Sequence, residues 1–252
     1  MNRFDGKVVL VTGGGSGVGR ATSLAFAREG ATVVVAGRRM AAIAETADLI
    51  RRAGGHGDAL TVDVTDEDDV ARLIASIGSR HDRLDVALKN AGILGIPGPV
   101  TQLSRDGWSA VIQTNLTGVW LCMKHEIAWM TAQGGGTIVN MAANIGAHMT
   151  IPALAAYSAS KAAVSALTRV AALECAADGI RINAVSPGLV DTDMSLLPGE
   201  SRAERDARLK GAIPAGRIAD PDEIARAVLW LASDEARFVI GHDLVIDGGA
   251  SL

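Results

Sequence analysis

The sequence predicts a single α/β domain, residues 1–252, built on a doubly wound parallel sheet. Short runs of β-branched and aliphatic residues alternate along the chain with longer segments of helical pattern, as in successive βαβ units. A glycine-rich stretch directly follows the first of these runs. The chain is long enough for one such domain, and its 48% hydrophobic content supplies a core and excludes global disorder.

Seven aliphatic runs are expected to form the strands of the parallel sheet. The run at 32–35 is continuously apolar, which is typical of a parallel strand buried on both faces. In chain order, the expected strands lie at 8–11, 32–35, 60–64, 84–88, 137–140, 181–185 and 244–247.

Helical stretches separate these strands. Gly30 and the pair Gly54-Gly55 should end the first two helices, because glycine is favoured just beyond a helix C-terminus. The acidic run 66–68 suits the positive end of the next helix dipole. The expected helices are 17–29, 40–53, one starting near 65–68, 104–118, 119–133, 153–177 and 222–232.

The longest stretch without a regular pattern is 191–219. Polar and charged residues dominate it around 199–202. An irregular segment of this length in a compact domain is usually a lid or a binding element, so we expect a substrate-binding loop here.

Charge and composition exclude several classes of function. With 24 Lys+Arg against 28 Asp+Glu the net charge is -4, so no nucleic-acid partner is expected. No apolar run approaches the ~20 residues of a membrane span, and the first residues lack a signal-peptide core. Two cysteines, Cys122 and Cys175, are too few for a disulfide framework and fit a cytoplasmic location. His125-Glu126 resembles the start of a zinc-protease helix, but Trp129 replaces the second ligand, so no metal is expected.

Residues 12–19 lie between the first strand and the first helix, where backbone N–H groups and the helix dipole favour an anion. Glycines at 13, 17 and 19 allow a tight turn and the close approach of a pyrophosphate. The spacing matches neither Gly-x-Gly-x-x-Gly nor a P-loop, and a plain tight turn is the alternative. Its place at the first βα turn favours a dinucleotide site of the Rossmann type.

The residues after the second strand bear on the choice of dinucleotide. The acid that would bind the ribose 2′-hydroxyl, expected about 20 residues beyond the glycines, is missing. Gly37 is followed instead by Arg38, whose guanidinium could bind a 2′-phosphate. We therefore predict NADP(H), with NAD(H) as the alternative, although a solvated basic helix start would have the same sequence and Ser16 adds no second cation.

Tyr157 and Lys161 stand four residues apart, on one face of a predicted helix. A neighbouring cation stabilises a phenolate and lowers the pKa of tyrosine from its ordinary value of about 10. The pair therefore suits a general acid for a carbonyl or a general base for an alcohol. This spacing is a common coincidence, but Tyr157 is the single tyrosine of the chain.

Taken in order, the motifs resemble those of the classical short-chain dehydrogenase/reductase family over essentially all of the chain. The resemblance implies a Rossmann-type domain, a homotetramer, and hydride transfer between a nicotinamide and a ketone or secondary alcohol, as in carbonyl reductases and alcohol dehydrogenases. The motifs are Thr12-Gly13-x-x-x-Gly17-x-Gly19, Asn90-Ala91-Gly92, Asn115, Tyr157-x-x-x-Lys161, Pro187-Gly188-x-Val190-x-Thr192 and Asp247-Gly248-Gly249.

The resemblance also implies a role for each motif. Tyr157 would exchange the proton, Lys161 would bind the nicotinamide ribose, and Asn115 would hold a water that links Lys161 to solvent. Asp63 and Val64 would contact the adenine, and 187–192 would seat the carboxamide. The implied cofactor-binding residues are Gly13, Ser16, Val18, Gly19, Arg38, Asp63, Val64, Asn90, Ala91, Gly92, Lys161, Pro187, Gly188, Val190 and Thr192.

Two positions depart from the family pattern. Lys89 stands before Asn90 where the family usually has another asparagine, and we expect it at the surface, with a cation beside the cofactor as the alternative. Ala143 occupies the position of the serine that binds the substrate oxygen. The amide of Asn144 could donate in its place, although adjacent side chains on an extended backbone point to opposite faces.

Ala143 leaves three hypotheses open: an active carbonyl or alcohol enzyme, an impaired member that binds cofactor with little turnover, or one redirected to imines. A single missing residue in a complete site suggests a deliberate substitution. The substrate, a small carbonyl or alcohol, should contact 143–154, Leu189 and the loop 193–213. His148 could face it, although a structural or solvent-exposed role is the simpler expectation.

Overall fold

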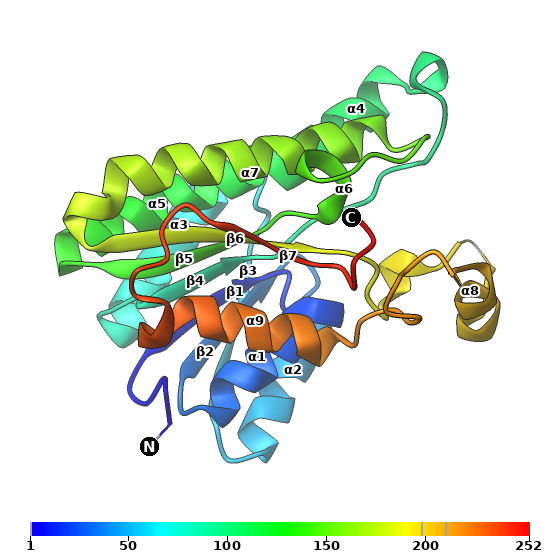
Figure 1. The fold of residues 1–252 in the computed structure, drawn as a ribbon. Helices are drawn as coiled ribbons and strands as arrows, with labels where there is room; N and C mark the ends of the chain where they lie inside the picture. The colour runs from blue at the N-terminus through cyan, green and yellow to red at the C-terminus, as the bar shows by residue number, and fades with distance from the viewer. Residues whose placement is uncertain (1, 198, 210) are drawn as a thin grey trace.

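The computed structural model describes residues 2–197, 199–209 and 211–252, which form one three-layer α/β domain (Figure 1). Its seven strands pair in parallel in the order β3-β2-β1-β4-β5-β6-β7, so the predicted doubly wound sheet is confirmed. The strands are β1 (Val8–Thr12), β2 (Thr32–Gly37), β3 (His56–Thr61), β4 (Val86–Lys89), β5 (Gly136–Met141), β6 (Ile180–Pro187) and β7 (Asp243–Ile246).

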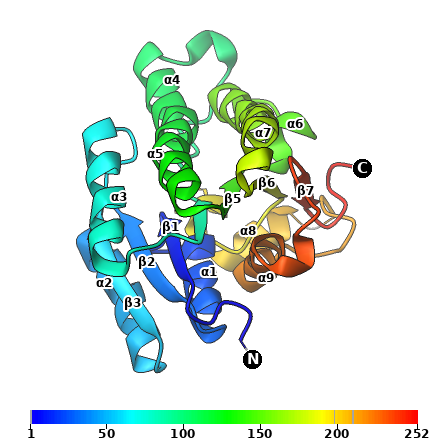
Figure 2. The ribbon, with the colours of Figure 1, turned by 90° about the vertical axis from the view of Figure 1, so that its left-hand side faces the viewer.

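Two helical layers cover the sheet, with α3, α5 and α7 on one face and α1, α2 and α9 on the other (Figure 2). Side chains along a strand alternate between the faces, so Leu10 and Val34 pack into the first core and Val9 and Val33 into the second. The helices are α1 (Gly17–Arg28), α2 (Met40–Arg52), α3 (Glu67–His81), α4 (Arg105–Ile112), α5 (Gly118–Gln133), α6 (Asn144–Ala147), α7 (Ala155–Cys175), α8 (Arg202–Leu209) and α9 (Pro221–Ala232).

The strand order reverses between β1 and β4, and the chain leaves β1 toward one face and β4 toward the other. Ligands of open α/β sheets bind beyond the carboxyl ends of the strands at such a switch point. The short helix α6 and the outlying helix α8 both lie beyond this end of the sheet (Figure 1). Among the described residues, no helix is both long and apolar enough to cross a membrane.

The third strand is the element whose predicted position was wrong. We expected it at 60–64, but β3 ends at Thr61 and begins at His56, with His56 opposite Thr32 of β2. This edge strand has little apolar character, so its sequence gave no signal of its start. The chain turns away from the strand direction at Asp63, because the Asp63 carboxylate accepts hydrogen bonds from the backbone N–H and the hydroxyl of Thr65 at 3.0 and 2.8 Å.

Helix boundaries near the site also differ from the expectation. The predicted helix 104–118 is α4 followed by a π-helical turn, Gln113–Thr117, which continues into α5. Helix α7 begins at Ala155 instead of 153, because Ala153 has a φ of 70°, outside the range of a right-handed helix.

The stretch 191–219 is only partly irregular, because it contains a short 3₁₀ turn, Asp193–Ser195, and the helix α8. Its two ends are fastened together, since Asp191 N–H donates to the carbonyl of Ala219 and Ala219 N–H donates to that of Leu189, both at 2.9 Å. Pro198 and Lys210 of this stretch lie outside the described residues. The segment therefore leaves the end of β6 and returns beside its own starting point. We call it the excursion.

Candidate active site

The glycine-rich turn after β1 lies directly against the segment that follows β4. A Cβ built on Gly13, whose φ is +67°, would lie 2.9 Å from the backbone of Ala91, and one on Gly19 would lie 2.3 Å from the carbonyl oxygen of Gly13. Asn90 donates from Nδ2 to that carbonyl at 3.1 Å, and its backbone N–H donates to Thr12 Oγ1 at 3.1 Å. The two segments thus form one glycine-lined cradle at the switch point.

The predicted cofactor residues around this cradle lie in different surroundings. Ser16 is exposed at the N-cap of α1, and Val18 packs partly buried against the core beneath that helix. Val64 is buried, and a Cβ on Gly118 would lie 2.8 Å from its Cγ2. Gly92 follows Ala91 past the cradle, and a Cβ on it would lie 3.8 Å from Lys161 Nζ.

Arg38 stands exposed just beyond the carboxyl end of β2, followed by the equally exposed Arg39. Within the described part of the chain, neither guanidinium has a carboxylate within 4.0 Å, whereas the nearby Arg20 pairs with Glu45 at 2.6 Å. Gly37 places no carboxylate at the strand end. A cationic side chain is therefore available where a ribose 2′-phosphate would lie.

Tyr157 and Lys161 project from the first turns of α7, with Lys161 Nζ 5.8 Å from the centroid of the tyrosine ring. Lys161 is buried and donates to the carbonyl oxygen of Met141, at the end of β5, at 2.6 Å. Burial raises the pKa of Tyr157 to about 12 and lowers the pKa of Lys161 to about 8. The lower phenol pKa that the sequence led us to expect is absent from this structure, because desolvation dominates.

Asn115 lies on the π-helical turn between α4 and α5 and joins three parts of the site. Its Oδ1 accepts from Ile93 N–H at 2.8 Å, and its Nδ2 donates to the carbonyl of Ile93 at 2.9 Å and to Ser160 Oγ at 3.2 Å. Ser160 in turn donates to the carbonyl of Tyr157 at 2.7 Å. Single π-turns inside helices are frequent at functional sites, and this one brings a buried amide between the segment after β4 and α7.

Ala143 and Asn144 are both buried, but only the side chain of Asn144 can donate hydrogen bonds. Ala143 is the residue before α6, with an extended backbone. Asn144 donates from Nδ2 to Asp247 Oδ2 at 3.1 Å and to the sulfur of Met149 at 3.1 Å. Both N–H bonds of its amide are therefore used within the protein, which leaves no donor to stand in for the family's serine.

The motif after β6 closes the site from the other side. A Cβ on Gly188 would lie 2.7 Å from Cβ of Asp247, so only glycine fits between this motif and the one that ends the chain. Val190 is buried and forms an isolated bridge with Ala219. A Cβ on Gly17 would lie 3.0 Å from Thr192 Cγ2, which places Thr192 over the glycine-rich turn. Pro187, at the end of β6, is buried and Leu189 is half-buried.

Lys89 is a correction to the sequence analysis, since its side chain is buried in an ion pair and does not lie at the surface. Its side chain is 2% exposed at the end of β4 and forms an ion pair with the fully buried Glu126 of α5. It also donates to the carbonyl of Ala87 at 3.3 Å. Burial raises the pKa of Glu126, and the attraction of Lys89 opposes that shift. A lysine ending the apolar run of a central strand was the signal that could have predicted a buried partner.

His148 takes the structural role that we favoured for it. Its Nε2 lies 3.0 Å from Oδ2 of Asp243, which begins β7. The same carboxylate, nearly buried, accepts from the hydroxyls of Ser165 and Ser186 at 2.5 and 2.6 Å. Sequence reasoning missed Asp243, which ties the segment after α6 to α7 and β6.

The chain resembles known proteins over nearly its whole length. The chain matches the family model described as enoyl-(acyl carrier protein) reductase over residues 13–251. It is 45% identical to a cis-4-hydroxycyclohexanecarboxylate dehydrogenase of Sinomonas cyclohexanicum, covering 98% of this chain and 97% of that protein. It is 38% identical to a cyclohexanol dehydrogenase of an Acinetobacter species, covering 98% and 96%.

Solved structures give the same result. A levodione reductase superposes with a TM-score of 0.94 at 33% identity, covering 99% of both chains. A short-chain dehydrogenase/reductase of Burkholderia xenovorans superposes with a TM-score of 0.91 at 40% identity, covering 100% of this chain and 98% of the other. The likeness therefore spans the whole domain, the excursion between β6 and α9 included.

Removal of either partner of the buried ion pair between Lys89 and Glu126 is expected to destabilise the protein strongly. Glu126→Gln leaves the Lys89 ammonium buried without its counter-charge, so the free energy of unfolding should fall by about 3–5 kcal/mol in denaturant titrations. Lys89→Met with Glu126→Leu should recover most of that loss. The control is Lys124→Met, on the same helix as Glu126. It breaks an exposed ion pair with Glu67 of α3 and should cost about 1 kcal/mol or less. Equal losses from Glu126→Gln and Lys124→Met would contradict the assignment.

Proposed function

Since the chain belongs to the short-chain dehydrogenase/reductase family and is thus an oxidoreductase, we propose that it is an NADP(H)-dependent enzyme acting on alicyclic secondary alcohols and ketones. The observation that carries the proposal is the assembly of Tyr157, Lys161 and Asn115 beside the glycine-lined cradle. These side chains come from two distant segments of the chain. Their convergence beyond the carboxyl ends of β1, β4 and β5 suits chemistry on a dinucleotide-bound substrate.

The cradle fits a dinucleotide, because it lies at the N-terminus of α1, where backbone N–H groups and the helix dipole favour a pyrophosphate, and its glycines allow the close packing against Ala91 that a side chain would prevent. When bound, the nicotinamide cofactor supplies or accepts the hydride. On this chain, 13–19 would hold the pyrophosphate, Arg38 the 2′-phosphate and Asp63 the adenine. Asn90, Ala91 and Gly92 would border the adenosine side, and the motif 187–192 would receive the carboxamide.

Tyr157 supplies the proton in this proposal. With a pKa of about 12 its phenol stays protonated at neutral pH, which suits donation to the oxygen of a ketone. Alcohol oxidation needs the phenolate, so that direction gains as pH rises toward the phenol pKa. Lys161, with a pKa of about 8, remains mostly charged at neutral pH and stands ready to stabilise the phenolate after donation. Asn115 fixes the backbone around Tyr157 through Ser160 and would hold the water that links Lys161 to solvent.

The substrate class rests on the relatives, and a small apolar pocket beside Tyr157 is compatible with it. Apolar side chains line this pocket together with the tyrosine: Leu94, Ile96, Leu103, Val111 and Leu154. Relatives named for alicyclic substrates include the cis-4-hydroxycyclohexanecarboxylate and cyclohexanol dehydrogenases, a cyclopentanol dehydrogenase at 39% identity, and levodione reductase. The pocket measures only about 10 Å³, which is less than a ring needs, so we propose that the ring binds at its mouth, with Leu189 and the segment from Ala143 and Asn144 to Leu154 completing the site.

The deciding assay is a substrate panel. Purified protein is incubated with cyclohexanol, cyclopentanol, the matching ketones, an acyclic secondary alcohol and a cyclic imine, and the absorbance of NADPH or NADH is followed. Turnover of the cyclic alcohols and ketones with NADP(H) supports the proposal. Turnover confined to the imine, or none at all, contradicts it.

A second candidate is an impaired or redirected enzyme, and Ala143 is the observation that favours it. No hydroxyl stands at that position, and Asn144 is engaged with Asp247. Such a protein would bind cofactor and turn over carbonyls slowly, or reduce imines, for which a donor matched to a carbonyl oxygen is dispensable.

We also propose that the protein is a homotetramer. Large apolar side chains stand exposed on α5, on α7 and on the segment just before β7: Trp120, Val170, Leu173, Phe238 and Ile240. Contiguous exposed apolar surface marks sites of association. The two free cysteines are buried, which is compatible with the cytoplasmic location that we propose.

Arg38 is expected to carry the preference for NADP(H). Arg38→Ala removes the charge-assisted contact to the 2′-phosphate, worth about 1.5–3 kcal/mol, so kcat/KM with NADPH should fall about ten- to a hundredfold while kcat/KM with NADH stays within about twofold. Arg39→Ala, an exposed neighbour, is the control and should change neither. An unchanged ratio of the two kcat/KM values in Arg38→Ala would refute the assignment.

Tyr157→Phe is expected to lower turnover by about 10²–10⁴-fold, because the ring still packs but the proton donor is gone. Cofactor affinity, followed by fluorescence titration, should stay within about twofold of the parent. A variant that keeps more than about a tenth of the parent rate would show that another group supplies the proton.

Ala143→Ser is expected to raise kcat for ketone reduction at least about tenfold, since a second donor then stabilises the charge developing on the substrate oxygen. Cofactor affinity should not change. Asn144→Ala, measured beside it, should leave the chemical step intact, because that amide is bound to Asp247. If the serine variant reduces ketones no faster, the substrate oxygen is not stabilised from position 143, and the redirected enzyme is the better reading.

A further inference from the structure

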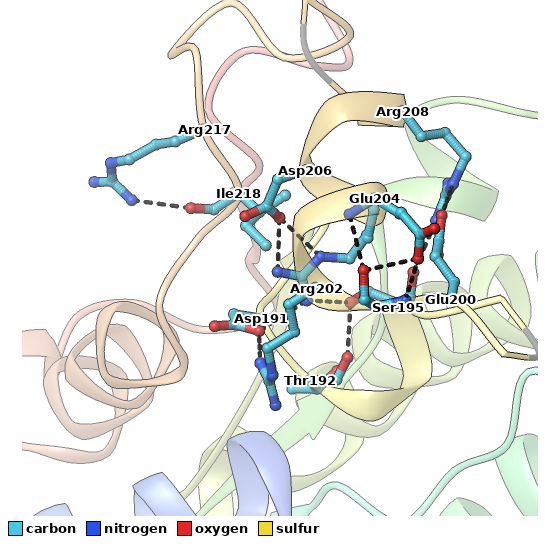
Figure 3. A network of polar contacts seen from close by, with 12 residues as sticks. Asp191, Thr192, Ser195, Glu200, Arg202, Glu204, Asp206, Arg208, Arg217 and Ile218 are labelled. Atoms are coloured by element: carbon cyan, nitrogen blue, oxygen red, sulfur yellow. Dashed lines mark hydrogen bonds and ion pairs between the residues drawn. The ribbon is translucent and has the colours of Figure 1, made fainter.

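The helix α8 carries three arginines toward the segment that leaves β6, and one of them is unlike the others. Arg205 is 1% exposed, whereas Arg202 and Arg208 lie at the surface. Figure 3 shows Asp191, Thr192 and Ser195 on one side of this network, and Arg202 and Arg208 reaching it from α8. A buried guanidinium so far from the hydrophobic cores needs its own set of acceptors.

Arg205 has such a set, and part of it belongs to the segment bordering the cradle. Its Nη1 donates to Asp191 Oδ1 at 2.8 Å and to Ser195 Oγ at 3.1 Å. Its Nε and Nη2 donate to Asp206 Oδ1 at 3.0 and 2.7 Å. The guanidinium thus joins α8 to the residues on either side of Thr192.

Thr192 is held from three directions. Ser195 Oγ, which receives the Arg205 bond, donates to the carbonyl of Thr192 at 2.7 Å. The backbone N–H of Asp191 donates to Ala219 at 2.9 Å, at the far end of the excursion. On the other side, Thr192 Cγ2 lies within 3.0 Å of where a Cβ of Gly17 would stand. A shift of Arg205 would therefore act, through Asp191 and Ser195, on Thr192 beside the glycine-rich turn.

The other two arginines make a useful contrast. Arg202 pairs with Asp191 and Asp193 from the surface. Arg208, also at the surface, pairs with Glu200 at 2.7 Å and donates to the carbonyl of Ser195 at 3.1 Å. Solvent-exposed pairs contribute little, because water and salt screen them. Loss of a buried partner leaves an uncompensated charge behind, so Arg205 and its acceptors should keep one geometry.

We propose that Arg205 is a positioning residue that, through Asp191 and Ser195, fixes Thr192 against the glycine-rich turn and so prepares the site for the nicotinamide half of the cofactor. The inference rests on the proposed function, since it requires that the protein bind a nicotinamide dinucleotide. It assigns Arg205 no contact with substrate or cofactor. Its distinctive consequence is that loss of Arg205 weakens the binding of the nicotinamide half of the cofactor and leaves the binding of the adenosine half unchanged.

The test compares whole dinucleotides with fragments that lack the nicotinamide. Dissociation constants are measured by calorimetry on the apoprotein for NADPH and 2′,5′-ADP, and for NADH and 5′-ADP. Arg205→Met should weaken the bound dinucleotide about tenfold or more, yet leave its fragment within about twofold. Ser195→Ala, which removes the link to Thr192 without stranding a charge, should give a smaller loss of the same selectivity. Arg217→Met, which breaks an exposed pair with Glu223 of α9, is the control and should change neither constant.

Circular dichroism and thermal melting establish that each variant is folded. Should Arg205→Met fail to fold, Arg205→Lys, which keeps the charge but cannot make the forked contacts, and Ser195→Ala decide the question by the same selectivity. Equal losses for dinucleotide and fragment, or no loss for either, overturn the inference while the proposed function stands. If the parent protein binds neither dinucleotide, the proposed function itself fails, and the inference falls with it.

Discussion

The site depends on the close approach of the glycine-rich turn after β1 to the segment after β4. A Cβ at Gly13 or Gly19 would lie 2.9 or 2.3 Å from neighbouring backbone, so only glycines permit the contact. With them in place, Asn90 donates two hydrogen bonds to Thr12, from its backbone N–H to Oγ1 and from Nδ2 to the carbonyl oxygen. The cradle, the proposed catalytic side chains of α7 and the segment after β6 are all arranged around this junction, because the strand order reverses there.

Burial determines the electrostatics beside the cradle. The same desolvation that lowers the pKa of Lys161 from 10.5 to about 8 raises that of Tyr157 from 10.0 to about 12, so burial moves two similar pKa values apart. The phenol therefore keeps its proton at neutral pH, which in the proposed function suits donation to a ketone.

Two buried cations fasten the segments that border this site. Lys89 immediately precedes Asn90 and is held by Glu126, while Arg205 holds Asp191, which immediately precedes Thr192. Neither charge touches the proposed reacting groups. A buried charge tolerates few geometries, because each displaced hydrogen bond leaves it unsolvated, so both cations limit the movement of the backbone next to them.

The sequence by itself determined the parallel α/β class, six of the seven strands to within a few residues, and the glycine turn, because apolar periodicity and glycine spacing are local properties. It identified Tyr157 and Lys161 through their spacing on one helix. It could not place the polar edge strand β3, the helix α8, the buried pair of Lys89 and Glu126, or the engagement of Asn144 with Asp247. The pairs of Lys89 with Glu126 and of Asn144 with Asp247 join residues tens of positions apart. The strand β3 depends on the backbone hydrogen-bonding groups that its neighbour β2 leaves unpaired on that side. Desolvation also reversed the expected pKa shift of Tyr157, because burial is a property of the packed tertiary structure and has no local sequence signal.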